Sequence, residues 1–141
     1  NIIGDRGTHG VIFDFIHKLK NDPTKLEVLG NGRQEKSYMD VNDCVAAILH
    51  IFQTENEAIN LFNLGSHDTC SVTRIAEIVI EKTGYHDAVI SYTGGERGWA
   101  GDIPRAMLSI DKMLSTGYDV SYNSEGAVGN TAEVLIKEIG L

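Results

Sequence analysis

The sequence of 141 residues contains few cysteines and few prolines. It has two of each, Cys44 and Cys70, and Pro23 and Pro104. Two cysteines are too few for a disulfide framework, and without a Cys-x-x-Cys pair or clustered histidines they do not make a zinc site. We therefore expect no metal site, and we expect Cys44 to be a small buried residue of a helix.

Long apolar runs and basic clusters are also missing. No stretch reaches the roughly 18 apolar residues of a membrane span, and no charged-then-apolar leader occurs, so we expect neither a membrane span nor a signal peptide. The formal net charge is -8, from 20 acidic and 12 basic residues. Nucleic acid is bound through dense lysine and arginine, which this chain lacks. We expect a cytoplasmic protein with neither a membrane nor a nucleic acid as its partner.

Common catalytic motifs are not found. There is no Gly-x-Ser-x-Gly, no P-loop and no His-Glu-x-x-His. Gly94, Gly95 and Gly98 come closest to a dinucleotide fingerprint, but they precede a Gly-Asp-Ile-Pro turn in which no phosphate-binding helix can begin. Asp40 and Asp43 suggest a carboxylate pair, although at the head of a helix they are more simply a cap and a dipole partner. We therefore predict no catalytic residues on this chain.

The patterns that are present predict one α/β domain. Of the residues, 42% are hydrophobic, enough for a single core at this length. About five helical and five strand-like patterns alternate along the chain. The helical patterns lie at residues 11–19, 45–52, 72–79, 111–117 and 128–139. Ser71 and Ser124 are the expected caps of the third and the last, and we expect Pro23 to end the first helix and Gly84 to end the third. The strand-like patterns lie at residues 1–4, 26–29, 34–38, 59–64 and 88–92, and a further brief extended piece lies at residues 107–110.

The stretch from Leu26 to Asp43 combines two extended segments, a glycine turn and a cation. Residues 26–29 and 34–38 flank the turn, and Lys36 shares one face of the second segment with Gln34 and Tyr38. Two strands converging here can offer backbone groups to a flat ring and the charge of Lys36 to a phosphate. The alternative, favoured by the local pattern alone, is an ordinary hairpin with Lys36 in solvent.

Five motifs in order resemble the C-terminal half of extended short-chain dehydrogenase/reductases. They are Asn1-x-x-Gly4, L-E-V-L-G-N-G-x-Q-x-K-S-Y-x-x-V-x-D, F-N-L-G-S, S-V-T-R-I-A-E and R-G-W-A-G-D-I-P. Within that group the chain is most similar to the NAD-dependent epimerase/dehydratase family, and there to the UDP-glucose 4-epimerases. The resemblance extends over essentially the whole chain.

The resemblance implies a two-part enzyme, in which an N-terminal Rossmann domain holds NAD and a Tyr-x-x-x-Lys pair. No tyrosine of this chain is followed four positions later by a lysine. We therefore expect residues 1–141 to be a small mixed α/β nucleotide-sugar-binding domain that lacks its Rossmann partner, a fragment in which residues 1–4 end a Rossmann strand. NAD is expected in the parent protein and not on this chain, which alone should neither retain NAD nor interconvert UDP-glucose and UDP-galactose.

The resemblance also implies which residues contact the nucleotide sugar. Asn1 would approach the diphosphate, and the backbone at Glu27 and Leu29 would read the uracil edge. Lys36 stands where the family usually has an arginine for the phosphates, and Tyr38 keeps the tyrosine of the same pattern.

Three further contacts follow from the first helix and the glycine-rich segment. Val11 would touch the nucleotide from the start of the helix, and Asp102 would lie near the ribose. Arg97 would supply a second cation for the phosphates, although the chain departs from the family pattern there, with Trp99-Ala100 in place of the usual Arg-Pro before Gly101-Asp102.

Two interpretations stay open on the sequence. The first is a UDP-sugar-binding domain of an NAD-dependent epimerase, and the second is a stand-alone, non-catalytic binding or interaction module. Under the first, Ile2, Ile3 and the face that meets the Rossmann domain would be uncovered, so we also expect weak self-association.

Overall fold

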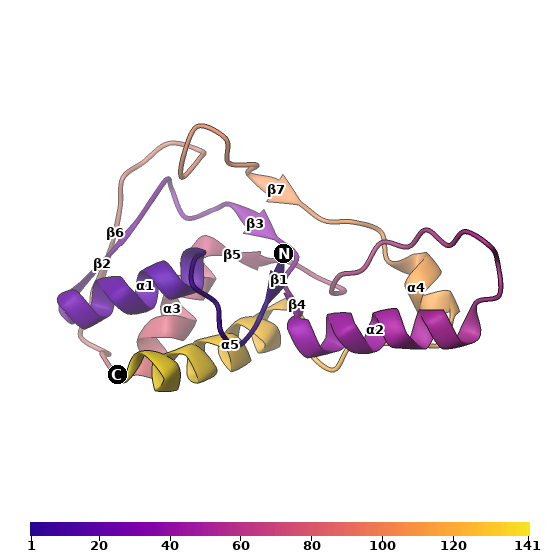
Figure 1. Ribbon diagram of the computed structural model, residues 1–141. Helices are drawn as coiled ribbons and strands as arrows, with labels where there is room; N and C mark the ends of the chain where they lie inside the picture. The colour runs from indigo at the N-terminus through magenta and orange to yellow at the C-terminus, as the bar shows by residue number, and fades with distance from the viewer.

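Five helices and seven short strands form the chain in this computed structural model, which describes residues 1–141 (Figure 1). The helices are α1 (Val11–Asn21), α2 (Val41–Thr54), α3 (Val72–Thr83), α4 (Asp111–Ser115) and α5 (Ser124–Ile139). The strands are β1 (Ile2–Ile3), β2 (Lys25–Val28), β3 (Glu35–Lys36), β4 (Met39–Asp40), β5 (Cys70–Ser71), β6 (Val89–Tyr92) and β7 (Arg105–Ala106). The expected mixed α/β fold is confirmed.

The strands form three small sheets rather than one. β1 pairs with β4 and β2 pairs with β6, both in parallel. The third sheet has the order β5-β3-β7, with β3 antiparallel to β5 and parallel to β7. Sheets of two or three short strands are marginal alone, so their stability depends on the helices packed around them.

The main core lies in a larger lobe made of α1, α3, α5 and the β2/β6 sheet (Figure 1). Each of the three helices turns one apolar stripe inward, because its apolar residues recur every three or four positions. The fully buried side chains of this core include Ile16, Leu19, Leu26, Val28, Ile75, Val79 and Val128. Cys70 belongs to the same core, whereas Cys44 on α2 is only half-buried.

Caps explain where several helices begin and end. The Asp40 carboxylate accepts from the Asn42 N–H at 2.8 Å, the Ser71 hydroxyl accepts from the Arg74 N–H, and Gly84 ends α3 in the left-handed conformation, all as expected. The cap of α5 is Asn123 rather than Ser124. Ser124 is fully buried and its hydroxyl donates to the Asp68 carbonyl, so it is not available for capping.

The prediction that residues 26–29 and 34–38 converge as paired strands is wrong, and so is the hairpin alternative. β2 pairs with β6 and β3 lies between β5 and β7. The connecting turn is held from outside, because the Thr73 N–H donates to the Gly32 carbonyl and the Gly94 N–H donates to the Gly30 carbonyl. Partners distant in sequence therefore occupy the edges that a hairpin would use.

Two other expected strands differ from the structure. Residues 59–64 form no strand, and the side chains of Ile59 and Leu61 are 89% and 82% exposed. The expected strand at residues 107–110 is replaced by β7, which ends at Ala106 where its pairing with β3 ends. In both cases an apolar extended segment finds no neighbouring strand in this chain.

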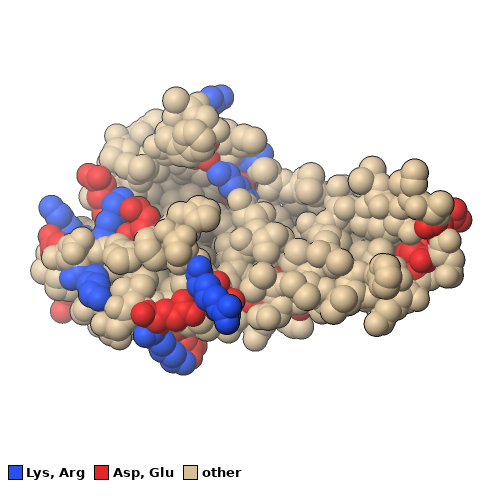
Figure 2. All heavy atoms as spheres, viewed as in Figure 1, with Lys and Arg blue, Asp and Glu red and all other residues tan.

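Helix α2 turns its most apolar face to solvent. The apolar spacing places four residues on one face of this helix, and all four are at least half exposed, namely Val45, Ile48, Leu49 and Phe52. Instead Ala47 and Ile51 pack into a second, small core with residues of β4 and α4. Figure 2 shows this arm, made of α2, α4 and residues 55–64, with few charged atoms except at its far end. Periodicity thus identifies an apolar face without telling what covers it.

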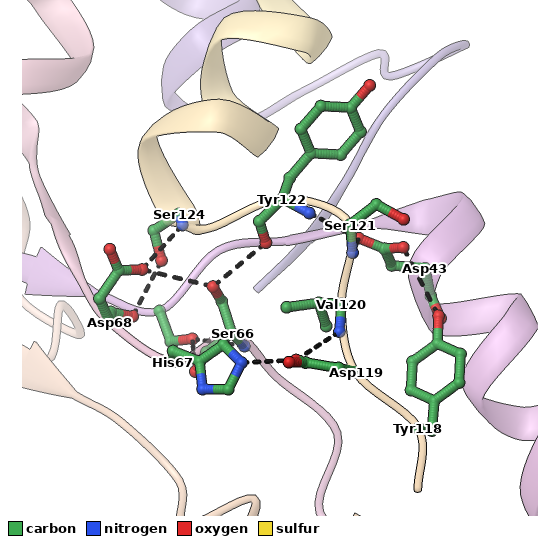
Figure 3. A network of polar contacts seen from close by, with 11 residues as sticks. Asp43, Ser66, His67, Asp68, Tyr118, Asp119, Val120, Ser121, Tyr122 and Ser124 are labelled. Carbon is green, nitrogen blue, oxygen red and sulfur yellow. Dashed lines mark hydrogen bonds and ion pairs between the residues drawn. The ribbon is translucent and has the colours of Figure 1, made fainter. Parts of the chain in front are cut away.

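A polar network joins the arm to the larger lobe (Figure 3). The buried Asp43 carboxylate on α2 accepts from the Ser121 and Tyr122 N–H groups at 2.9 and 3.2 Å. Beyond this loop, the Ser124 N–H donates to the Asp68 carboxylate at 2.8 Å. Asp43 therefore anchors the loop before α5, a role beyond the dipole partner expected from its position.

None of the five helices combines the length and apolarity that crossing a membrane requires.

Stability separates the covered core from the exposed face of α2. We expect Ile75→Ala, which removes a fully buried side chain, to lower the free energy of unfolding by about 2–5 kcal/mol. Phe52→Ala, at a side chain that is 84% exposed, should change it by no more than about 0.5 kcal/mol. Urea denaturation followed by circular dichroism measures both. Equal losses for the two variants would show that the face of α2 is covered in solution.

The exposed face of α2 also predicts weak, concentration-dependent self-association, because an uncovered apolar face gains by contact with another. Leu49→Glu should abolish this association, whereas Gln53→Glu, on a polar neighbour of the same helix, should leave it unchanged. Sedimentation velocity over a range of concentrations makes the comparison. A tight dimer that persists at nanomolar concentration would contradict the prediction.

Candidate functional site

A cleft of about 650 Å³ lies between the start of α1, strand β3 and the turn at residues 98–102. Figure 2 shows it as a hollow in the face of the larger lobe. Its walls are largely apolar, with Ile3, Val11 and Phe15 on the side of α1, and its polar groups include Asn1, Lys36 and Asp102. A mostly apolar cleft with a few convergent polar groups is the usual form of a small-molecule site.

The strongest electrostatic contact in the cleft joins Lys36 and Asp102. The Lys36 ammonium donates to one carboxylate oxygen of Asp102 at 2.5 Å, and the Gly98 N–H donates to the other at 3.1 Å. The Asp102 side chain is 8% exposed. Burial alone would raise the pKa of Asp102, but the bonds from Lys36 and Gly98 outweigh burial and hold that pKa below its ordinary value. Asp102 is therefore ionised at neutral pH.

Strand β3 fixes the position of Lys36 from both sides. Its residues pair with Ser71 and Cys70 of β5 and with Arg105 and Ala106 of β7. The Glu35 N–H donates to the Pro104 carbonyl at 2.8 Å, just before β7 begins. Lys36 is thus supported by a backbone paired on both edges, and the expected hairpin with Lys36 free in solvent does not occur.

Tyr38 is a wall of the cleft rather than a proton donor. Its side chain is 5% exposed, and its N–H donates to the Ser124 hydroxyl at 3.0 Å. Burial, together with the nearby Cys70 and Asp102, raises the pKa of Tyr38 to about 12. The phenol therefore stays protonated at neutral pH.

Asn1 adds an amide side chain to the cleft lining, and the start of α1 at Val11 adds backbone N–H groups. The Asn1 side chain donates to the Ser37 carbonyl at 3.1 Å, which orients the asparagine at the edge of β1. Gly10 precedes Val11 and gives α1 no side-chain cap. The first N–H groups of α1 therefore lack a protein partner and remain available to an anion at the cleft.

The structure brings six of the eight predicted contact residues together, namely Asn1, Val11, Leu29, Lys36, Tyr38 and Asp102. Glu27 and Arg97 lie outside the cleft wall. The Glu27 carbonyl accepts from the Lys18 ammonium at 3.0 Å. Arg97 is exposed, and its guanidinium donates to the Ala100 carbonyl at 3.4 Å. Lys36 thus belongs to the cleft wall and Arg97 does not, and the expectation that both contact the diphosphate stays a prediction.

Two cleft residues have no assigned role in the sequence reasoning. Gln34 and Thr131 are both 2% exposed, and the Gln34 Oε1 and Thr131 Oγ1 atoms have no hydrogen-bond partner. Gln34 donates through Nε2 to the Leu29 carbonyl at 3.1 Å, which leaves only its oxygen free. The extended pattern placed Gln34 on one face with Lys36, but nothing in the sequence pointed to Thr131 in α5.

The sequence reasoning also missed a Gly-x-x-Gly-x-x-Gly spacing at Gly4, Gly7 and Gly10, between β1 and α1. This loop lines the cleft, yet it does not fit NAD. A dinucleotide-binding unit needs a strand, helix and strand of one parallel sheet. Here β1 and β2, which flank α1, belong to different sheets. The loop from Gly4 to Gly10 therefore does not belong to a dinucleotide-binding unit of that kind.

In chemical terms the cleft offers one lysine, the uncapped amides of α1 and apolar walls, together with the carboxylates of Asp5, Asp14 and Asp102. The lysine, the amides and the apolar walls suit an anion attached to a ring. Lys36 is the only lysine or arginine that lines it.

Asp102→Asn tests the ion pair with little change of shape. Because the folded-state pKa of Asp102 is lowered, its contribution to stability is present above the unfolded pKa of about 3.9 and is lost as the pH falls through the folded pKa. At pH 7 we expect the variant to lose about 1–3 kcal/mol of unfolding free energy.

The difference between Asp102→Asn and the unsubstituted protein should shrink below about pH 4, where the carboxylate of the unfolded chain becomes protonated, and should vanish once the pH has passed the lowered pKa of the folded state. Asp87→Asn, at an exposed position, is the control and should stay within about 0.5 kcal/mol at every pH. Urea denaturation at several pH values measures the profile. A loss that does not depend on pH would refute the role of the charge.

Comparison with known proteins gives consistent results. Residues 1–65 match the model of the NAD dependent epimerase/dehydratase family. A Methanocaldococcus jannaschii protein, itself provisionally described as a UDP-glucose 4-epimerase, is 27% identical over 122 residues, which is 84% of this chain and 37% of that protein.

Solved structures extend the likeness over the whole chain. A UDP-galactose 4-epimerase is 35% identical with a TM-score of 0.84, covering 99% of this chain and 44% of that chain. The UDP-glucose 4-epimerase of Thermotoga maritima, solved with UDP-glucose, has the same fold at 24% identity, with a TM-score of 0.79 and the same coverage. The chain spans less than half the length of these relatives. Residues 1–65 thus match the NAD dependent epimerase/dehydratase family, and the whole chain has the fold of part of these epimerases.

Proposed function

We propose that this chain forms the nucleotide-sugar-binding part of a longer NAD-dependent epimerase, with a UDP-sugar as its substrate. The observation that carries the proposal is the cleft, in which Lys36, the uncapped start of α1 and an apolar wall converge. The family match adds support, as does the UDP-sugar named for the similar solved structures.

The diphosphate would lie at Lys36. No other lysine or arginine lines the cleft, and the N–H groups at the start of α1 would complete its hydrogen bonds from the other side. Asn1, oriented by the Ser37 carbonyl, would add an amide to the same site. Because Lys36 is already paired with Asp102, part of its charge is compensated before a ligand binds.

The nucleobase would lie on the side of Leu29 and Gln34. Leu29 is partly exposed to the cleft, and the buried Gln34 oxygen can accept from a base N–H group. The side chain of Glu27 points elsewhere, so the role proposed for it is confined to the backbone of β2. Asp102 would reach the ribose with the carboxylate that also holds Lys36.

The rest of the enzyme would be a Rossmann domain that holds NAD and the catalytic pair. The exposed apolar face of α2 and the unpaired segment at residues 59–64 support this part of the proposal, since both need covering. Under the alternative interpretation, a stand-alone binding or interaction module, a separate partner protein would have to cover the same surface.

Titration with UDP tests the cleft directly. We expect binding in the roughly millimolar range, about 4 kcal/mol in total, because water reaches the phosphates of the open cleft. Lys36→Ala should weaken UDP binding by the loss of a charge-assisted contact of about 1.5–3 kcal/mol at most, reduced by the pairing with Asp102. Arg97→Ala, which removes a cation outside the cleft wall, should weaken it less.

Uridine is the matched ligand control, because it lacks the diphosphate. It should bind with nearly the same affinity to the unsubstituted protein, to Lys36→Ala and to Arg97→Ala. Amide chemical shifts follow each titration. If UDP shifts neither residues 26–38 nor residues 97–102, the proposed cleft does not bind nucleotides. If Lys36→Ala and Arg97→Ala weaken UDP binding equally, Lys36 is not the cation that contacts the diphosphate.

A further inference from the structure

Trp99 stands between the cleft and a second cavity. This cavity has a volume of about 420 Å³ and shares with the cleft only the residues Asn1, Lys36, Trp99 and Asp102. Trp99 is the single tryptophan of the chain, and its side chain is 67% exposed. A large aromatic ring is thus left in contact with water at the junction of two cavities.

The turn that carries Trp99 is held in one conformation by its neighbours. The Asp102 N–H donates to the Trp99 carbonyl at 3.0 Å, and the Asp102 carboxylate binds both the Gly98 N–H and Lys36. Gly101 lies against the indole so closely that a Cβ atom there would collide with the ring. The sequence of the turn therefore fixes the indole at this junction.

The two cavities differ in their linings. The cleft has the Gln34 oxygen and the start of α1, whereas the second cavity is bounded mainly by apolar side chains and the Ser37 region. Those apolar residues are Leu64, Ile103, Met107 and Leu108. Lys36 is again the only lysine or arginine in the lining.

This arrangement sets the order of groups in a bound nucleotide sugar. The diphosphate lies at Lys36, since both cavities share that cation, and the nucleoside occupies the side with Gln34. The sugar beyond the diphosphate then extends into the second cavity, past Trp99. One face of a hexose presents C–H groups, and these pack favourably against the negative face of an indole.

We propose that Trp99 stacks on the hexose ring of the nucleotide sugar and makes binding depend on that sugar. The inference rests on the proposed function and deepens it, because it assigns a residue to the sugar rather than to the nucleotide. A stacking contact adds affinity without charge, which suits a site with a single lysine.

The fluorescence of the only tryptophan reports on this contact. UDP-glucose should change the emission of the 141-residue chain, whereas UDP and uridine at equal saturation should change it much less. Trp99→Ala should weaken UDP-glucose binding about tenfold, measured by amide chemical shifts, and should alter UDP binding by less than about twofold. Trp99→Phe should recover part of the loss. Phe52→Ala, at an exposed aromatic residue of the arm, should change neither affinity.

Each other outcome has a definite meaning. Suppose that UDP shifts the amide signals of residues 26–38, but UDP-glucose does not change the tryptophan fluorescence and Trp99→Ala does not weaken UDP-glucose binding. The stacking proposal then fails, and the nucleotide cleft stands. If uridine alone produces the full fluorescence change, Trp99 stacks on the base and its assignment to the sugar is wrong. If none of the three ligands shifts any residue of the cleft, both proposals fail.

Discussion

The carboxylate of Asp102 is the group on which the shape of the cleft depends. A buried carboxylate is costly unless it is paired, and here Lys36 and the Gly98 N–H together supply the partners. One oxygen therefore attaches the turn at residues 98–102 to β3, while the other shapes the turn itself. The same contact that keeps the carboxylate ionised brings Trp99 opposite the start of α1. Without it, the cleft would lose one of its walls.

The two lobes of the molecule are joined by polar contacts rather than by a shared apolar core. The arm has its own small core, and the network of Asp43, Asp68 and Ser124 links it to α5 and to the turn after residue 65 (Figure 3). Tyr38 extends this link toward the cleft, because its N–H uses the Ser124 hydroxyl. Buried networks of this kind fix a unique arrangement when all their members are satisfied. The position of β3, and so of Lys36, follows from that arrangement.

The sequence predicted what depends on local chemistry and missed what depends on distant partners. Helices α1 and α3 were predicted nearly to the residue, since their apolar spacing and the caps at Ser71 and Gly84 are local signals. The partners of β2 and β3 come from segments far along the chain, so a local pattern suggested a hairpin that does not exist. The apolar spacing of α2 likewise identified one face of the helix but could not tell that this face is exposed. Resemblance found six cleft residues, but the direction of Arg97 depends on a turn geometry that no motif specifies, and Thr131 carried no signal at all.

The pairing of β3 has a consequence for how the chain acquires its structure. Lys36 and Asp102 are 66 positions apart, and Tyr38 and Ser124 are 86 positions apart. Contacts of such separation cost loop-closure entropy before they stabilise anything, and they slow folding. During synthesis the ribosome must release α5 before Val128 and Leu135 can complete the main core. Strand β3 gains its second neighbour only when Arg105 and Ala106 of β7 have been made, so the surface around Lys36 and Asp102 forms after all the segments between them.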